Sequence, residues 1–262
     1  MKFIEKLEKA IKKNDSLVCV GLDTDVKKIG KGKNQFLFNK EIIKATNDLV
    51  CSYKLNAAFY ESIGHKGIES LKKTCDYLKT NHPEIPIIID AKRADIGNTN
   101  EGYVQFIFTH LKADALTIHP YLGQEAIRPF LNQLDKGIII LCRTSNPGAG
   151  EFQDLEVKGT PLYKIVAKQV TRKWNTNGNC LLVVGATYPK ELREVRRIVG
   201  QEMFFLVPGI GAQGGDIKST LKAGLNNRKT GLIINSSRGI IFADNPREEA
   251  KKLKSEINQY RN

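Results

Sequence analysis

The chain has 262 residues, and 41 Lys and Arg against 28 Asp and Glu give it a formal net charge of +13. This length is enough to bury a large core, and it suits one α/β barrel as well as two smaller domains. The basic residues are scattered in pairs such as Lys12–Lys13 and Lys72–Lys73, without interleaved aromatic residues. We therefore expect them to cover solvated helix faces or to attract small anions, and we expect no nucleic-acid partner.

The cysteines and the N-terminus suggest where the chain works. The five cysteines are Cys19, Cys51, Cys75, Cys142 and Cys180; no two of them form a C-x-x-C pair, and four of them lie in apolar strand-like runs. This pattern indicates buried thiols in a reducing compartment. The segment Met1–Lys6 is too charged for a signal peptide, and no apolar run approaches the length of a membrane span. We expect a cytoplasmic protein that does not contact a membrane.

In chain order, a helix at Phe3–Lys12 precedes a regular alternation of apolar runs and segments with helical spacing. The apolar runs are Leu17–Gly21, Leu49–Leu55, Ile85–Asp90, Ala115–His119, Gly137–Cys142, Cys180–Gly185, Met203–Pro208 and Gly231–Asn235. Two helix starts carry capping signals, Asn98 with Glu101 and Asn245 with Glu248.

Strands that are apolar throughout and alternate with helices indicate a parallel sheet that is buried on both faces. Eight such units in a chain of this length predict a (β/α)₈ barrel. No low-complexity linker divides the sequence, so we expect one domain over residues 1–262, with the N-terminal helix covering the bottom of the barrel. The active site should then lie at the C-terminal ends of the strands.

The third apolar run ends in Asp90, Lys92 and Asp95. Side chains two positions apart on a strand point to the same face, so Asp90 and Lys92 should lie together. Lys54 ends the neighbouring second strand and should face them. The pattern by itself also fits a solvated strand end. If the groups are buried, the carboxylates favour a protonated lysine, which suits Lys92 as a proton donor better than as an imine-forming amine.

Two glycine-rich stretches follow the last two strands, Pro208–Gly215 and Asn235–Gly239. Barrels commonly bind a phosphate with these two loops, and Arg238 supplies a cation. The spacing Gly209-x-Gly211-x-x-Gly214 also satisfies the dinucleotide fingerprint. We reject that interpretation because the fingerprint should open a βαβ unit, and only about one strand remains after it.

Taken together and in this order, these motifs resemble orotidine 5′-phosphate decarboxylase, and the resemblance covers nearly the whole chain. The matching residues are Val20–Asp23, Lys54, Asp90-x-Lys92-x-x-Asp95-Ile96, Thr144-Ser145, Pro208–Gly215 and Ser237–Gly239. The resemblance implies decarboxylation of orotidine 5′-monophosphate to uridine 5′-monophosphate, with no metal and no organic cofactor.

The resemblance also implies roles for individual residues. Lys92 would protonate C6, Asp90 would lie against the departing carboxylate, and Lys54 would lie between Asp90 and the ribose. Asp23 would bind the ribose and Ser145 the pyrimidine ring. The phosphate end would comprise Pro208, Gly209, Gly211, Gln213, Ser237 and Arg238. The family forms homodimers with shared sites, so Asp95, Ile96 and Thr99 would reach into the partner's site.

Three alternatives remain at this point. A related sugar-phosphate decarboxylase or aldolase would share the D-x-K-x-x-D motif and use magnesium, but the second strand of those relatives carries an acidic ligand where this chain has Lys54. A Schiff-base aldolase would use Lys92 as a nucleophile, and a noncatalytic protein would bind phosphate ligands or nucleic acid through its charge. The segment Arg143–Thr160, rich in Gly and Pro, is predicted to form part of a lid.

Overall fold

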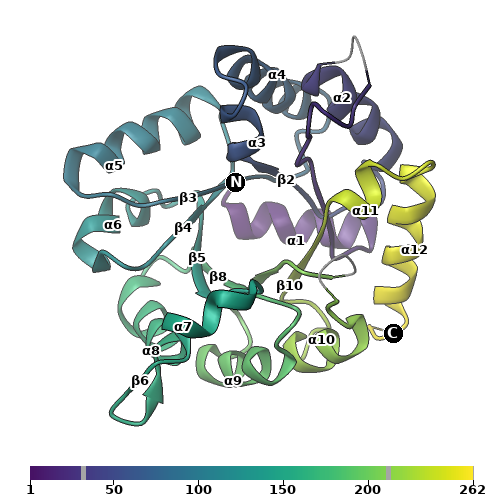
Figure 1. Ribbon diagram of the computed structural model, residues 1–262. Coiled ribbons are helices and arrows are strands. Elements are labelled where there is room, and N and C mark those ends of the chain that lie inside the picture. Colours follow the sequence, from purple (N-terminus) through teal and green to yellow (C-terminus); the bar gives the residue numbers. More distant parts are fainter. Residues whose placement is uncertain (31–33, 211–213, 262) are drawn as a thin grey trace.

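The computed structural model describes residues 1–30, 34–210 and 214–261. Parallel strands close into a barrel in the order β1-β10-β9-β8-β5-β4-β3-β2 (Figure 1). They are β1 (Val18–Gly21), β2 (Ser52–Asn56), β3 (Ile87–Arg93), β4 (Ala115–Ile118), β5 (Gly137–Arg143), β8 (Cys180–Val184), β9 (Phe205–Val207) and β10 (Leu232–Ser236). The predicted (β/α)₈ barrel is confirmed.

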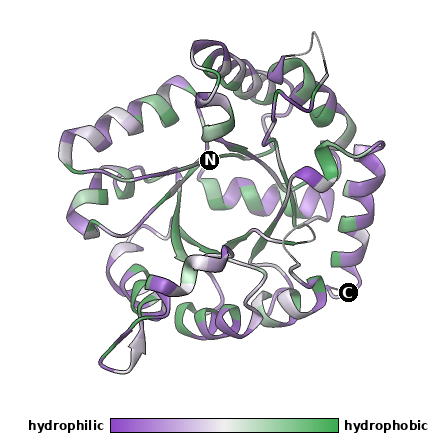
Figure 2. Ribbon diagram, viewed as in Figure 1, coloured by the Kyte–Doolittle hydropathy of each residue, from purple (hydrophilic) through white to green (hydrophobic). Residues whose placement is uncertain are grey.

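Helices surround the barrel because each presents one apolar stripe to strands that are buried on both faces (Figure 2). The longer helices are α2 (Gln35–Thr46), α4 (His65–Asn81), α5 (Gly97–Val104), α6 (Gly123–Leu131), α8 (Leu162–Gln169), α9 (Pro189–Val199), α10 (Ile217–Gly224) and α12 (Pro246–Asn258). The shorter ones are α3 (Ala57–Glu61), α7 (Gly150–Gln153) and α11 (Arg238–Ile241), with a 3₁₀ turn η2 (Pro147–Ala149). Wider π-helical turns, η1 (Gln105–His110) and η3 (Val170–Trp174), extend α5 and α8.

The N-terminal helix α1 (Phe3–Asn14) lies across one end of the barrel, as predicted (Figure 1). The Phe3 ring packs against the start of β5, where a Cβ on Gly137 would lie only 2.4 Å from it. Nζ of Lys6 lies 2.9 Å from Oδ2 of Asp114, just before β4. Since both contacts join the amino ends of strands, α1 closes the bottom and leaves the carboxyl ends for a site.

Local details differ from the sequence predictions. A short antiparallel pair, β6 (Glu156–Val157) and β7 (Thr160–Pro161), was not predicted. Asn245 caps α12 by accepting from the backbone N–H of Glu248, as expected. The prediction for Asn98 was wrong, because α5 begins at Gly97 and its cap position is Ile96, without a side-chain cap. None of the helices in the described ranges combines the length and apolar character that a membrane crossing requires.

Candidate active site

A cavity of about 860 Å³ opens at the carboxyl ends of the barrel strands. Nine of the residues singled out in the sequence line it, namely Asp23, Lys54, Asp90, Lys92, Ser145, Pro208, Gly209, Ser237 and Arg238. They come from the ends of six different strands, so the closed barrel is what brings together residues from positions 23 to 238. A volume of this size accommodates a small-molecule ligand.

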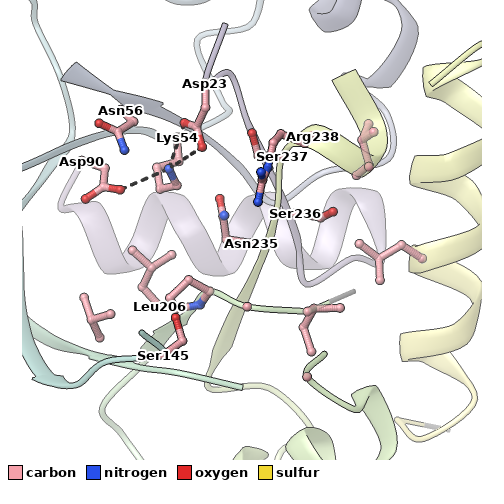
Figure 3. A pocket seen from close by; sticks show the side chains of 18 of the residues that line it. Asp23, Lys54, Asn56, Asp90, Ser145, Leu206, Asn235, Ser236, Ser237 and Arg238 are labelled. Atoms are coloured by element: carbon pink, nitrogen blue, oxygen red, sulfur yellow. Dashed lines mark hydrogen bonds and ion pairs between the residues drawn. The ribbon is translucent and has the colours of Figure 1, made fainter. Parts of the chain in front are cut away.

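Charged side chains of alternating sign form a row along one side of the cavity. Figure 3 shows Lys54 between Asp23 and Asp90, with its Nζ 3.1 Å from Oδ1 of the first and 3.2 Å from Oδ2 of the second. Nζ of Lys92 lies 2.7 Å from Oδ1 of Asp90. The structure thus brings together two carboxylates and two ammonium groups, and each contact is within the range of a charge-assisted hydrogen bond.

The row keeps its charges because the groups stabilise one another. Burial alone would raise the pKa of Asp90, but Lys54 and Lys92 outweigh it and hold that pKa well below its usual range. Burial alone would lower the pKa of Lys54, and Asp23 and Asp90 together raise it above the ordinary lysine value. At neutral pH Asp90 is therefore an anion and Lys54 a cation.

The two lysines differ in their access to water. The side chain of Lys54 is 4% exposed, whereas that of Lys92 is 50% exposed. Lys54 is thus confined between two carboxylates. Lys92 reaches into the open part of the cavity, where half of its side chain is accessible to solvent.

The loops after β9 and β10 form another part of the cavity wall. Pro208 and Gly209 follow β9, and Ser237 and Arg238 follow β10. The hydroxyl of Ser237 donates to the carbonyl of Gly21 at 2.8 Å, and a Cβ on Gly21 would lie only 2.8 Å from the Cβ of Ser237. Glycine at the end of β1 is therefore required for this close approach. Gly211 and Gln213 lie outside the described residues.

An apolar wall lies between β5 and β9. It consists of Leu141, Val183 and Leu206, and Figure 3 labels Leu206 and Ser145 on this part of the cavity wall. Ser145 packs directly on Gly185, where a Cβ would lie 2.7 Å from the serine Cβ. The cavity is thus charged along one side and apolar along another.

The segment predicted to be part of a lid runs along the rim of the cavity. It contains η2, α7 and β6, and four of its residues line the cavity, Thr144, Ser145, Asn146 and Gln153. Oε1 of Gln153 accepts from the backbone N–H of Thr144 at 2.8 Å, and Arg143 pairs with Asp154 at 3.0 Å. These contacts fold the segment onto the end of β5. Its movement as a lid remains a prediction.

Three of the predicted residues do not line the cavity of their own chain. Oδ1 of Asp95 accepts from the backbone N–H of Ile96, and the side chains of Ile96 and Thr99 are exposed. Ile96 is 60% exposed. Their assignment to a partner's site stays a prediction. His119, interpreted as a packed residue, contacts the carbonyl of Ala94 through Nε2 at 3.1 Å.

Sequence reasoning missed other residues of the site. Asn56 lines the cavity, and its position two residues after Lys54 on the same strand could have indicated this. Thr117 contacts Asp90 and Lys92 from β4, and its signal was a lone hydroxyl in an otherwise apolar strand. The sequence did not indicate Gln153 as a site residue, because this residue does not directly follow a predicted strand. Across the described ranges, no group of three or more His, Cys, Asp or Glu is arranged to hold a metal ion.

Comparison with known proteins shows the family of the chain. The family model described as Orotidine 5′-phosphate decarboxylase / HUMPS family matches residues 16–253. The chain belongs to this family. Among curated orotidine 5′-phosphate decarboxylases, the one from Cupriavidus metallidurans is 46% identical over 273 aligned positions, which cover 100% of this chain and 99% of the relative. That from Cellvibrio japonicus is 47% identical and covers 98% of each chain.

Solved structures of the family superpose over the whole chain. Leishmania donovani OMP decarboxylase has a TM-score of 0.90 at 39% identity, covering 100% of this chain and 99% of its own. Leishmania donovani UMP synthase has a TM-score of 0.93 at 41% identity, and the match covers 57% of that longer chain. The barrel is therefore that of the orotidine 5′-phosphate decarboxylase family.

Proposed function

We propose that Lys92 delivers a proton to C6 in the reaction that this chain catalyses, the decarboxylation of orotidine 5′-monophosphate to uridine 5′-monophosphate. The observation that carries the proposal is the row Asp23–Lys54–Asp90–Lys92 inside the cavity. It places a half-exposed ammonium group beside a carboxylate whose pKa is held low. The same cavity is lined by Arg238 and the turn at Gly209, where a phosphate would bind.

The chemistry needs a cation in place before the bond breaks. When the bond between C6 and the carboxylate breaks, its electron pair stays on C6 and carbon dioxide leaves. An ammonium group that is already positioned stabilises this developing charge without reorganisation. C6 then takes a proton from Lys92, which becomes a neutral amine and regains a proton from water. Lys54 is a poorer candidate because it is enclosed by two carboxylates and 4% exposed.

The remaining row residues prepare the charge pattern. Asp90 would lie against the substrate carboxylate and hold Lys92 on the other side, and Lys54 would connect Asp90 to the ribose. Asp23 would bind a ribose hydroxyl. Leu141, Val183 and Leu206 offer an apolar surface, which suits neutral carbon dioxide better than a carboxylate.

Substrate binding would be divided between the two ends of the nucleotide. Ser145 would contact the pyrimidine ring, and Pro208, Gly209, Ser237 and Arg238 the phosphate. Gly211 and Gln213 are proposed at the phosphate on the strength of the family resemblance alone. Binding energy from a phosphate that takes no part in bond breaking can be used to order the rim segment 143–160 over the ring.

We also propose that the active form is a homodimer in which Asp95, Ile96 and Thr99 of one subunit complete the cavity of the other. The support for this is indirect. These residues lie between the end of β3 and the first turn of α5, do not line the cavity of their own chain, and include the exposed apolar side chain of Ile96. A second copy would bury that side chain and add a carboxylate to the row.

The test is a spectrophotometric assay with orotidine 5′-monophosphate in the presence of EDTA. Full activity with the chelator is the expected result, because Lys54 occupies the place where magnesium-dependent relatives have an acidic ligand. Loss of activity with EDTA and its return with magnesium would favour the sugar-phosphate decarboxylase or aldolase alternative. Trapping of substrate on Lys92 by borohydride would instead indicate Schiff-base chemistry.

A further inference from the structure

The pairing between β3 and β4 is interrupted where the charged row begins. Three residues of β3, 90–92, lie between the paired positions Ile89 and Arg93. Over the same stretch, the partner strand β4 offers a single residue, Thr117. The extra residues form a bulge, and a bulge leaves ladder hydrogen bonds unmade and redirects the side chains it carries.

The bulge has an unusual backbone at its last residue. Lys92 has a φ of +48°, in the left-handed region that residues with a Cβ disfavour. Such a conformation persists only where the surroundings hold it in place. The neighbouring strand must therefore supply contacts that replace the missing ladder bonds.

The hydroxyl of Thr117 makes two such contacts. It donates to Oδ1 of Asp90 at 2.8 Å and accepts from the backbone N–H of Lys92 at 3.0 Å. Oδ1 of Asp90 is the same atom that Nζ of Lys92 contacts at 2.7 Å. The side chain of Thr117 is fully buried and does not line the cavity, so it touches the site only through these two residues.

We propose that Thr117 is a positioning residue, whose hydroxyl fixes the bulge and thereby sets the place of the Lys92 ammonium relative to Asp90. The proposal rests on the proposed role of Lys92 as proton donor. Without the hydroxyl, Asp90 loses a hydrogen-bond donor and the Lys92 N–H loses its acceptor. Both changes relax the bulge and move the ammonium group. Substrate binding at the Arg238 end is unaffected, because Thr117 has no contact there.

The experiment compares Thr117→Val, which keeps the shape and removes the hydroxyl, with Thr117→Ser, which keeps the hydroxyl. We expect kcat for orotidine 5′-monophosphate to fall roughly 10- to 100-fold in Thr117→Val, as for a lost hydrogen bond to a charged group. KM should stay within about threefold, because a positioning defect acts on the transition state. Thr117→Ser should restore kcat to within about threefold of the parent.

Thr46→Val is the matched control, because the buried Thr46 hydroxyl contacts Ile42 and Tyr53, and none of these three residues lines the cavity. Thr46→Val should be less stable than the parent, while its kcat should equal that of the parent.

A kcat in Thr117→Val equal to that of the parent would overturn the proposal. A loss of kcat in Thr117→Ser as large as that in Thr117→Val would overturn it as well. If Thr117→Val does not fold, Thr117→Cys replaces it. The thiol is a weak donor, so kcat should lie at least fivefold below that of Thr117→Ser, and equality would overturn the proposal. Absence of turnover in the parent would instead contradict the proposed function.

Discussion

Nζ of Lys92 lies 2.7 Å from Oδ1 of Asp90, although the two residues are only two positions apart on β3. In a regular strand, the Cα atoms of residues two positions apart are about 6.6 Å from each other. Here the bulge at residues 90–92 and the left-handed backbone of Lys92 replace that regular geometry. The contact that supports the proton-donor role thus depends on an irregularity of the strand.

Replacement of Lys92 directly tests its proposed role as proton donor. In Lys92→Ala we expect kcat to fall by about 10²- to 10⁴-fold or more, because the proton donor and the stabilising charge are both lost. Binding of uridine 5′-monophosphate, measured by calorimetry, should change by less than about tenfold, since the phosphate end is intact.

Lys112→Ala is the control for this substitution. Lys112 also has a positive φ and is exposed, but it lies outside the cavity. Its kcat should equal that of the parent. Turnover by Lys92→Ala within a few-fold of the parent would exclude Lys92 as the donor.

The proposed shared site predicts complementation between two inactive variants. Lys92→Ala and Asp95→Ala should each be nearly inactive alone. In a mixed dimer one site carries both defects, and the other combines an intact Lys92 with an intact Asp95 from the partner. At equal amounts with free exchange, about a quarter of the parent activity should return.

Subunit exchange is verified by mass spectrometry on one isotopically labelled variant. If exchange is complete and no activity returns, Asp95 does not act across a subunit boundary. A monomer in sedimentation at the assay concentration, with full activity, would also contradict the shared site.

Arg238 is expected to contribute to phosphate binding. We expect Arg238→Ala to weaken binding of uridine 5′-monophosphate roughly 10- to 100-fold, because a hydrogen bond between charged groups is removed. Uridine, which has no phosphate, should bind both proteins equally. Arg172→Ala, an exposed arginine on η3, serves as the control. An equal loss of affinity for uridine would mean that Arg238 acts on the fold of the loop.

The barrel could be predicted because each strand is apolar over its whole length and each helix is apolar on one stripe. These two periodicities are local properties of the sequence. The bounds of the strands were predicted less closely: the apolar run Met203–Pro208 is longer than β9, which spans Phe205–Val207. The β6–β7 pair was missed because each strand has two residues and no apolar pattern.

The site could be predicted only at the level of strand ends. Parallel strands in a closed barrel bring their carboxyl ends to one face, so Lys54 and Asp90 had to lie near each other. The bulge could not be predicted, because its contacts are not local: the backbone N–H of Lys92 donates to the hydroxyl of Thr117, 25 positions further along the chain. Gln153 was missed for a similar reason, since its place at the rim depends on how the segment after β5 folds back.

The buried cysteines lead to a prediction about alkaline pH. Burial raises the pKa of Cys51 above its ordinary value of 9.0, and it raises the pKa to about 12 for each of Cys19, Cys75, Cys142 and Cys180. A raised pKa in the folded state means that the thiols contribute stability below pH 9 and that this stability is lost as the pH rises above 9. For each thiol, the free energy of unfolding should fall by up to about 1.4 kcal/mol per pH unit in that range.

Urea unfolding between pH 7 and pH 10 measures this loss, and Lys6 provides an internal comparison. Burial lowers the pKa of Lys6 to about 8, so the unfolded state binds more protons between about pH 8 and 10.5, and Lys6 makes stability rise there. The gain from one amine is smaller than the loss from five thiols, so the free energy of unfolding should still fall. In Lys6→Met the loss above pH 9 should be steeper than in the parent. A free energy of unfolding that stays constant from pH 8 to pH 10 would show that the cysteines are not buried as the structure has them. The same would follow if the thiols of the native protein reacted with 5,5′-dithiobis(2-nitrobenzoate) as fast as those of the protein in urea.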